Sequence, residues 1–272
     1  PVLTRDFRWN TTLTWSKNDN KILSLAEGAD ENQVISTVGT ASIIGRVGGT
    51  TGDLWGYKLV RDPEGNVVIG DNGLPEQADE IEYVGTAYAD WKAGWYNEFS
   101  YKGFKLGILL DGQVGGTIYS MSFHKMMEQG KLTQSLNGRL PGTEYYMDAS
   151  DPRIAAAGYT PQSGMYMIAP GVVRNDDGTF SPNTKVVTIE SFYKEYYRRA
   201  NVETNSFDAS FLKIREIRLE YELPKKVLEK SPFSKASIAV YGRNLWCFTD
   251  YPLFDPESVA LGGSSIVSGI ET

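Results

Sequence analysis

The chain has 272 residues, of which 41% are hydrophobic and 22% are charged, and its formal net charge is −7. This length and composition allow a sizeable core and exclude a disordered tail, and the negative charge gives nucleic acid no general attraction. One cysteine, Cys247, and one histidine, His124, exclude an internal disulfide, a multi-cysteine zinc site and any mechanism that needs two histidines. The first residues lack the basic and apolar regions of a signal peptide, so we expect a processed chain or a piece of something longer.

Residues 5–17 are predicted to form a β-strand, because bulky and polar side chains alternate strictly along them. One face would carry aromatics such as Trp9 and Trp15, and the other would be polar. Residues 18–88 then form a long excursion, rich in glycine and turn signals, with only short strands at 34–45 and 54–61. Loops of this length inside a compact domain are uncommon unless they have a function.

Residues 89–101 and 104–117 form the clearest unit, a hairpin of two alternating strands joined by a tight turn at 101–103. Both strands are longer than the five or six residues typical of soluble proteins. A tilted strand needs about 9–11 residues to cross a bilayer. The hairpin therefore indicates strands that span a membrane.

Residues 118–209 form a second and longer excursion, for which we expect short helices at 121–130 and 190–201. Neither helix has the length or the apolar face of a membrane anchor. Residues 248–272, rich in Gly, Ser and Pro, are expected to form a third loop. These long connections contrast with the short ones predicted at 101–103 and 225–235.

Two further strands are predicted at 210–223 and 236–247. In the first, Leu212 and Ile214 have the opposite parity to Ile217, so the alternation changes phase near Arg215 and indicates either a β-bulge or an exit of the strand from the membrane. Long strands joined alternately by short turns and very long loops are typical of bacterial outer-membrane barrels. We therefore predict an all-β fold that forms a section of a large antiparallel transmembrane β-barrel with long extracellular loops.

Several segments also resemble the SusC/RagA family of TonB-dependent outer-membrane transporters. The similar segments follow the family order: 9–20 (WNTTLTWSKNDN), 54–57 (LWGY), 99–104 (FSYKGF), 115–119 (GGTIY), 210–224 (SFLKIREIRLEYELP), 241–246 (YGRNLW) and 255–257 (DPE). The resemblance implies that residues 1–272 form the C-terminal part of a barrel of about 22 strands, without the plug domain. It also implies location in the cell outer membrane.

The same resemblance implies active import of an oligomeric nutrient, a glycan or a peptide. TonB would supply the energy through the missing plug, and a SusD-like lipoprotein would cap the extracellular side. The bilayer is the other expected partner, and no nucleic acid is expected. Two alternatives from other classes remain: a soluble secreted carbohydrate-binding β-sandwich, and a fragment of a β-rich glycoside hydrolase.

No catalytic arrangement is present in the sequence, which lacks a GxSxG nucleophile motif. We expect His124 to be a solvated loop residue and Cys247 to be a structural thiol. Paired carboxylates such as Asp148 and Asp151 are expected in solvated turns. We predict a protein that is not an enzyme and that needs no cofactor or metal.

The candidate site residues form two sets, one in the loops and one on the strands. Aromatic loop residues are candidates for contact with substrate or with a lid protein, although packing within the loops is the alternative: Trp55, Tyr57, Tyr145, Tyr146, Tyr166 and Tyr197. Polar strand residues are predicted to face a wet lumen: Arg8, Asn10, Thr12, Glu98, Asp111, Gln113, Arg218 and Glu220. The opposite strand faces would contact lipid or its interfaces.

Overall fold

The structure is a computed structural model, and it describes residues 2–4, 6–229, 231–253, 255–258, 260–262 and 265–271. Arg5, where the first strand was predicted to begin, lies outside these residues. The chain forms two compact units. We call them the sheet unit (Pro1–Asp19, Tyr88–Gly116 and Asp208–Glu257) and the loop unit (Asn20–Ala87, Thr117–Phe207 and Ser258–Thr272).

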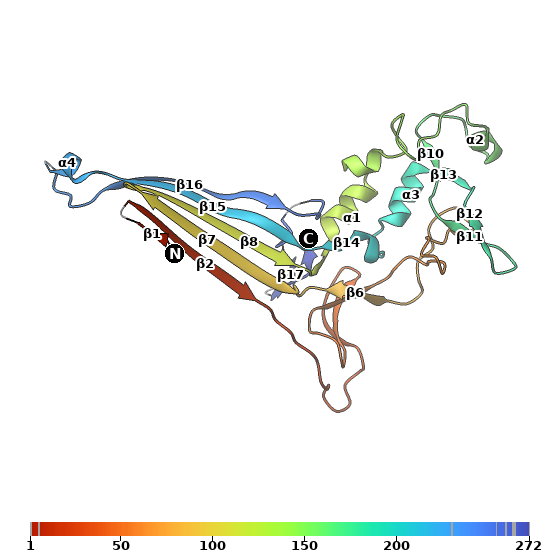
Figure 1. Cartoon of the computed structure of the whole chain (residues 1–272). Coiled ribbons are helices and arrows are strands. Elements are labelled where there is room, and N and C mark those ends of the chain that lie inside the picture. The colour runs from red at the N-terminus through yellow and green to blue at the C-terminus, as the bar shows by residue number, and fades with distance from the viewer. Residues whose placement is uncertain are drawn as a thin grey trace. The chain divides into compact units, whose positions relative to one another are not determined.

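The described part of the sheet unit is built on one six-stranded antiparallel sheet (Figure 1). Its order is β1 (Val2–Leu3), β2 (Phe7–Ser16), β7 (Trp91–Tyr101), β8 (Phe104–Val114), β15 (Phe211–Glu222) and β16 (Ser237–Phe248). A short helix, α4 (Lys225–Leu228), lies between the last two strands. The five long strands contain 10 to 12 residues each, which is the length that a tilted membrane strand needs.

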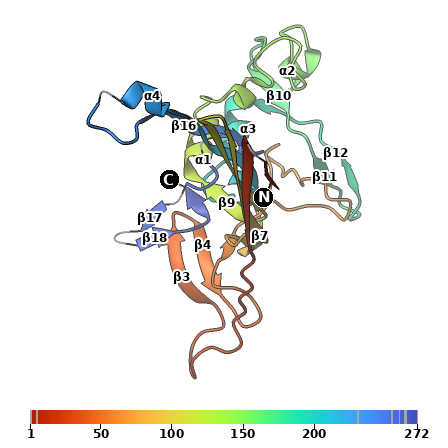
Figure 2. The ribbon, with the colours of Figure 1, turned by 60° about the vertical axis from the view of Figure 1, so that its left-hand side comes forward.

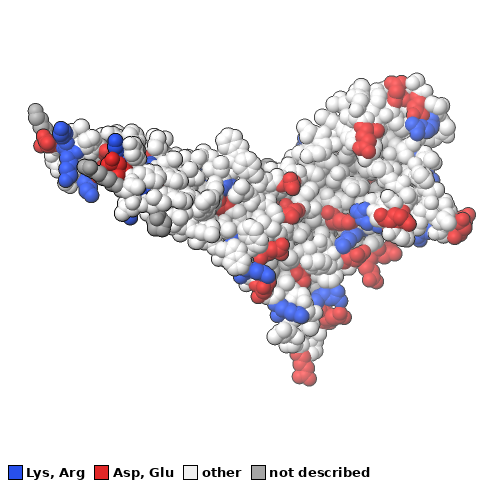
Figure 3. Space-filling view, in the orientation of Figure 1, with Lys and Arg blue, Asp and Glu red and all other residues white. Residues whose placement is uncertain are grey.

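The strand register collects the apolar side chains on one face of this sheet. Trp9 is opposite Phe99, and Phe99 is opposite Leu106. This face is open to solvent, since Leu13 is 71% exposed and Trp15 is 63% exposed. Figure 3 shows a largely uncharged surface over the strands, with Lys, Arg, Asp and Glu gathered elsewhere. A β-sandwich would cover such a face with a second sheet, and the described residues of the sheet unit form none.

The predicted bulge near Arg215 is confirmed. The register of β15 shifts between Ile214 and Glu216 against both of its neighbours. Because the extra residue reverses the alternation, Leu212 and Ile214 return to the apolar face that carries Ile217. In β16, Asn244 adopts a left-handed conformation (φ 49°) at the same level of the sheet.

The short and the long connections of the sheet lie at opposite ends of its strands. At one end, β7 turns into β8 through Lys102 (φ 43°) and Gly103 (φ 89°), and two consecutive residues with positive φ are typical of a type I′ hairpin turn. The long excursions all leave from the other end, because Ser16 pairs with Lys92, which pairs with Gln113. The final strand ends there too, since Phe248 pairs with Leu212.

The loop unit consists of small sheets and short helices (Figure 2). A four-stranded sheet contains β3 (Gln33–Val38), β4 (Ala41–Gly45), β5 (Asp53–Gly56) and β6 (Glu82–Thr86), and a three-stranded sheet contains β14 (Ser206–Asp208), β9 (Thr117–Ser120) and β19 (Ile270–Glu271). The strand pairs are β10 (Tyr166–Ile168) with β13 (Val186–Thr188), β11 (Val172–Arg174) with β12 (Phe180–Pro182), and β17 (Ala260–Gly262) with β18 (Ser265–Val267). The helices are α1 (Met121–Glu128), α2 (Pro152–Ala156) and α3 (Ile189–Tyr196), with 3-10 turns η1 (Thr133–Leu136) and η2 (Glu203–Asn205).

One core joins the three excursions into this unit. Ile43 and Leu54 from the first excursion pack with Tyr119 and Val202 from the second and with Ile270 from the last segment. The last segment, predicted as a third loop, adds β19 in parallel to β9. The alternation was too short there to indicate a strand, and burial of Ile270 against this core provides the stabilisation.

The helices α1 and α3 form near the positions predicted at 121–130 and 190–201. The expectation that His124 is solvated is wrong: it is 4% exposed, and its Nδ1 lies 2.7 Å from the carbonyl oxygen of Tyr197. It belongs to the buried face of α1 together with Phe123 and Met127. Within the described part of the chain, no helix is long and apolar enough to cross a membrane.

Candidate functional site

The polar face of the six-stranded sheet brings together the residues predicted to line a lumen. The register places all eight on one face: Arg8, Asn10, Thr12, Glu98, Asp111, Gln113, Arg218 and Glu220. Asn10 lies opposite Glu98, and its amide donates to that carboxylate over 3.5 Å. That this face lines a pore remains a prediction.

Ion pairs run across this polar face from strand to strand. Glu220 on β15 accepts from Arg218 at 2.5 Å and lies 3.6 Å from Lys105 on β8. Arg243 on β16 donates to Glu216 at 2.9 Å. Opposite charges on adjacent strands compensate one another, which lets one wall carry many charges without a strong field of one sign.

A denser group of charges, which we call the Lys213 cluster, consists of Asp111, Lys213, Arg215, Asp255 and Glu257. The Lys213 side chain is only 3% exposed, and its ammonium group donates to both Asp255 and Glu257. Arg215 lies 2.7 Å from Asp111 and also pairs with Glu257. The cluster therefore holds the segment after β16 against the polar face of the sheet.

The Lys213 cluster could not be derived from spacing. The DPE segment at 255–257 stood out only as a family resemblance, and its partners lie about 42 residues away in sequence. The ring of Phe211 adds a cation–π contact, with its centroid 4.5 Å from the Lys213 ammonium. The sequence feature that could have indicated the cluster is the pair of cations, Lys213 and Arg215, at the end of an otherwise alternating strand.

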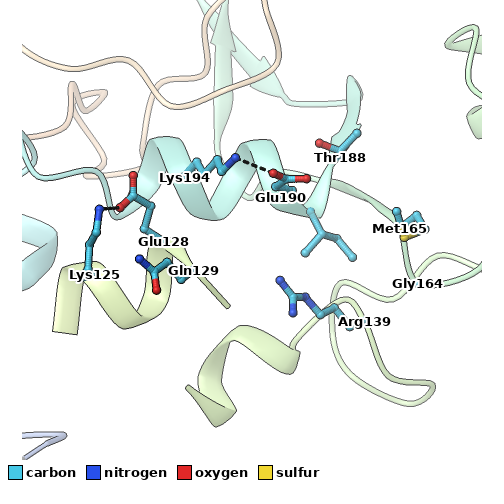
Figure 4. A pocket seen from close by; sticks show the side chains of 10 residues that line it. Lys125, Glu128, Gln129, Arg139, Gly164, Met165, Thr188, Glu190 and Lys194 are labelled. Atoms are coloured by element: carbon cyan, nitrogen blue, oxygen red, sulfur yellow. Dashed lines mark hydrogen bonds and ion pairs between the residues drawn. The ribbon is translucent and has the colours of Figure 1, made fainter. Parts of the chain in front are cut away.

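The loop unit contains an open pocket of about 640 Å³ between α1, α3 and the segments around residues 139 and 164 (Figure 4). Its lining combines charged and apolar side chains, including Lys125, Glu128, Arg139, Met165, Glu190 and Lys194. Thr188 caps α3 by accepting from the Ser191 amide at 3.1 Å, and residues at this N-terminal end of the helix, Thr188 to Glu190, line the pocket. This volume lies within the range usual for small-molecule sites, about 300–1,000 Å³.

Two of the three cations around the pocket are paired. Lys125 donates to Glu128 at 2.8 Å, and Lys194 donates to Glu190 at 2.5 Å. These hydrogen bonds lower the pKa of both carboxyls, so both are ionised at neutral pH. The guanidinium of the third cation, Arg139, forms no hydrogen bond or ion pair with any residue that the structure describes. Figure 4 shows its side chain reaching into the pocket.

The six aromatic candidates do not converge on one site. Trp55, on β5, is half-buried, with the Arg46 guanidinium 4.8 Å from its ring centroid and Tyr83 edge-on. Tyr57 follows β5, and its carbonyl accepts from Val202, which ties the first excursion to the second. Neither residue lines the charged pocket.

The other four candidates lie in the second excursion. Tyr166 is a core residue: it is 8% exposed, packs in a cluster with Ile154, and donates its hydroxyl to the Thr160 carbonyl. Tyr197 is half-buried beside Phe123, and burial raises its pKa above the ordinary tyrosine range. Tyr145 and Tyr146 are half-buried as well, and none of the four lines the pocket.

The paired carboxylates Asp148 and Asp151 have structural roles in their turn and helix cap. Among the residues that the structure describes, no three His, Cys, Asp or Glu side chains gather to hold a metal ion. Asp151 caps α2 by accepting from the Arg153 amide and pairs with its guanidinium, which is a structural role. Asp148 likewise accepts from Ser150 and Ser163 within its turn.

Comparison with known proteins identifies relatives over nearly the whole chain, although no family model matches. The chain is 24% identical over 94% of its length to TonB-dependent receptor P3 of Formosa agariphila, and 23% identical over 97% of its length to TonB-dependent receptor P26 of the same organism. It covers 24% and 25% of these receptors, so it spans about a quarter of their length.

The fold is shared with solved structures of the RagAB peptide importer. The closed-closed state matches over 94% of this chain and 25% of that chain, with a TM-score of 0.57 and 16% sequence identity. The open-open state matches over the same shares, with a TM-score of 0.54 and 14% identity. These relatives are receptors and importers, in agreement with the prediction of a protein that is not an enzyme. The chain is therefore similar to SusC/RagA-like TonB-dependent receptors over nearly its whole length, and its fold is that of a section of an antiparallel barrel of this kind.

Proposed function

We propose that the chain forms part of the wall and the extracellular loops of an outer-membrane importer of oligomeric nutrients. The remainder of the protein would supply the other strands and a plug on which TonB acts. A SusD-like surface lipoprotein would cover the loops and deliver the oligomer. The observation that carries this proposal is the two-faced sheet, with exposed apolar side chains on one face and paired charges on the other.

The physical argument rests on solvation. Exposing side chains such as Leu13, Trp15 and Val240 to water is unfavourable, whereas lipid tails would contact them without that cost. The opposite face, with Glu220 and Arg243 in ion pairs, requires water or a polar neighbour. The two edge strands, β1 and β16, have unpaired backbone groups that further strands of a closed barrel would satisfy.

The relatives favour an oligomer as cargo, because the solved neighbours are named a peptide importer. Peptide and glycan are the two candidate classes of cargo. Two observations support the SusD-like partner: the similarity of the fold to the RagAB peptide importer, and the large loop unit, which offers surface to a lid.

The proposal is tested on the full-length parent protein in its own outer membrane. Cells are given fluorescent peptides or fluorescent oligosaccharides, and uptake is measured with and without an uncoupler of the proton-motive force and with the neighbouring lipoprotein deleted. We expect uptake of one oligomer class that both treatments abolish. A parent protein that fractionates as soluble, or uptake insensitive to the uncoupler, would overturn the proposal.

A further inference from the structure

We propose that the loop-unit pocket binds a carboxylate of the transported oligomer through Arg139, with an aliphatic group of the same molecule against Met165 and Ile189. This inference rests on the proposed import function and names the chemical class of ligand: a short oligomer that bears a carboxylate. Two sources can supply that group, the terminus or side chain of a peptide and the uronate of an acidic glycan.

The guanidinium of Arg139 has no hydrogen-bond or ion-pair partner among the residues that the structure describes. Arg139 is half-buried and lines the pocket; its backbone amide donates to the Leu136 carbonyl, and its positive charge helps to lower the pKa of Glu190. Guanidinium groups in a partly buried site normally bind oxyanions in a bidentate manner. A pocket with one free guanidinium therefore suits a carboxylate of an incoming molecule.

The lining of the pocket has more cations than anions. Lys125 and Lys194 are neutralised by Glu128 and Glu190, so the pocket keeps the positive charge of Arg139. The first turn of α3 adds the partial positive charge of a helix N-terminus to the same lining. A ligand with a negative group gains from both, whereas a cationic ligand would be repelled.

Two glycines make room for Arg139 beside the pocket. A Cβ added at Gly130 would overlap its guanidinium, and a Cβ added at Gly164 would overlap its carbonyl oxygen. Both glycines have positive φ, at 67° and 69°. The apolar side of the pocket is provided by Met165, which is 45% exposed, and by Ile189.

A purely structural role for Arg139 is the competing explanation, because its guanidinium lies beside Gly130 at the C-terminal end of α1, where a cation also stabilises the helix dipole. The two roles differ in one measurable respect. Loss of a structural arginine weakens binding of all ligands alike, whereas loss of a carboxylate ligand removes only the preference for the charged form.

The experiment uses the purified full-length transporter and titration calorimetry at neutral pH. Two ligand pairs are compared: an aliphatic tripeptide and its C-terminal amide, and an oligogalacturonate and its methyl ester. The proteins are wild type, Arg139→Ala, Arg139→Lys, and the control Arg174→Ala, which removes an exposed arginine of the same unit that does not line the pocket.

We expect wild type and Arg174→Ala to bind the acid of one pair about tenfold more tightly than its neutral partner. Arg139→Ala should reduce this ratio to about one without changing affinity for the neutral ligand, and Arg139→Lys should retain part of it. The pair that shows discrimination identifies the source of the carboxylate. A ratio of one for both pairs in wild type, or a ratio unchanged in Arg139→Ala, would overturn the inference.

Uptake by cells separates this inference from the import proposal. Uncoupler-sensitive uptake that shows no dependence on Arg139 for acid over neutral oligomers would leave import intact and refute the carboxylate site. Conversely, an Arg139-dependent ratio in calorimetry without uptake of any oligomer would keep the site and refute import.

Discussion

The two units of this chain use their charged residues differently. In the sheet unit, Lys213 is nearly inaccessible and is held by two carboxylates that arrive from a distant segment. In the loop unit, Arg139 lines an open pocket and has no such partner among the described residues. A buried cation whose charge is compensated by carboxylates stabilises the structure. A half-buried cation without such a partner stays available to a ligand.

The units also differ in what determines each residue's environment. In the sheet, parity along the strand decides which face a side chain occupies, so neighbours such as Thr12 and Leu13 have opposite surroundings. In the loop unit, contacts between the excursions determine the environment of a side chain. Val202, for example, packs with Leu54 and Ile270. Substitutions in the two units are therefore expected to have different effects.

The largest effect is expected from a charge on the apolar face. Leu13→Lys should destabilise the full-length barrel by about 2–4 kcal/mol, because it places an ammonium group in lipid. Thr12→Lys, one residue away on the polar face, should change the stability by less than about 0.5 kcal/mol. Urea titration of the protein in liposomes, followed by its heat-modifiable mobility in gels, measures both. Equal effects of the two substitutions would contradict the assignment of faces.

The next effect concerns the Lys213 cluster. Lys213→Ala leaves Asp255 and Glu257 without their shared cation, and we expect a loss of about 2–3 kcal/mol, since both carboxylates keep some access to water. The control is Lys17→Ala, whose partner Asp19 is 80% exposed, with an expected loss below about 0.5 kcal/mol. The same urea titration applies. A variant that combines Lys213→Met with neutral residues in place of Asp255 and Glu257 should recover much of the lost free energy of unfolding. Failure to recover it would count against the cluster.

A third and smaller effect tests the packing of the loop unit. Gly56→Ala adds a Cβ that overlaps Val202 in the core, so we expect a loss of about 1–3 kcal/mol confined to the loop unit. Gly112→Ala in the sheet should be tolerated, because its Cβ would lie 3.4 Å from the Phe211 carbonyl oxygen. Hydrogen exchange of the full-length protein should become faster in the loop unit, residues 20–87, 117–207 and 258–272, and stay unchanged in the sheet unit. A Val202→Ala change on the same chain should relieve the Gly56→Ala effect.

The smallest effect is a dependence on pH. Burial lowers the pKa of His124 from its ordinary value of 6.5, while the Tyr197 carbonyl and Glu128 oppose this and Lys125 and Arg199 add to it. The unfolded chain therefore binds a proton more readily than the folded one, so stability is full above about pH 6.5 and falls as the pH decreases below it. Limited proteolysis of the loop unit at about pH 7.5 and pH 5.5 measures this. His124→Gln should remove the difference, and a stability that rises on acidification would contradict it.

The sequence predicted the sheet well because alternation is a local signal. The change of parity between Ile214 and Ile217 was enough to locate the bulge, and the glycine at 103 was enough to locate the hairpin turn. Each inference needed only neighbouring residues. The same locality explains why the eight polar residues of the strands could be assigned together to one face.

The candidate site was predicted less well, because it depends on contacts between remote segments. Tyr166 was proposed as a contact residue but lies in the core, since Ile154 and Val186 surround it. His124 was expected in solvent and is buried against Tyr197. Arg139 gave no signal, because its segment lacks periodicity and its pocket is assembled from four separate stretches.

The central claim is that the apolar face of the six-stranded sheet contacts lipid and the polar face contacts water. Spin labels placed singly along β2, from Thr11 to Ser16 of a full-length Cys247→Ser protein in liposomes, test it through their accessibility to oxygen and to a water-soluble nickel complex. We predict oxygen maxima at Leu13 and Trp15 alternating with nickel maxima at Thr12 and Thr14. Nickel access that is uniform along the strand, with no period of two residues, would contradict the account.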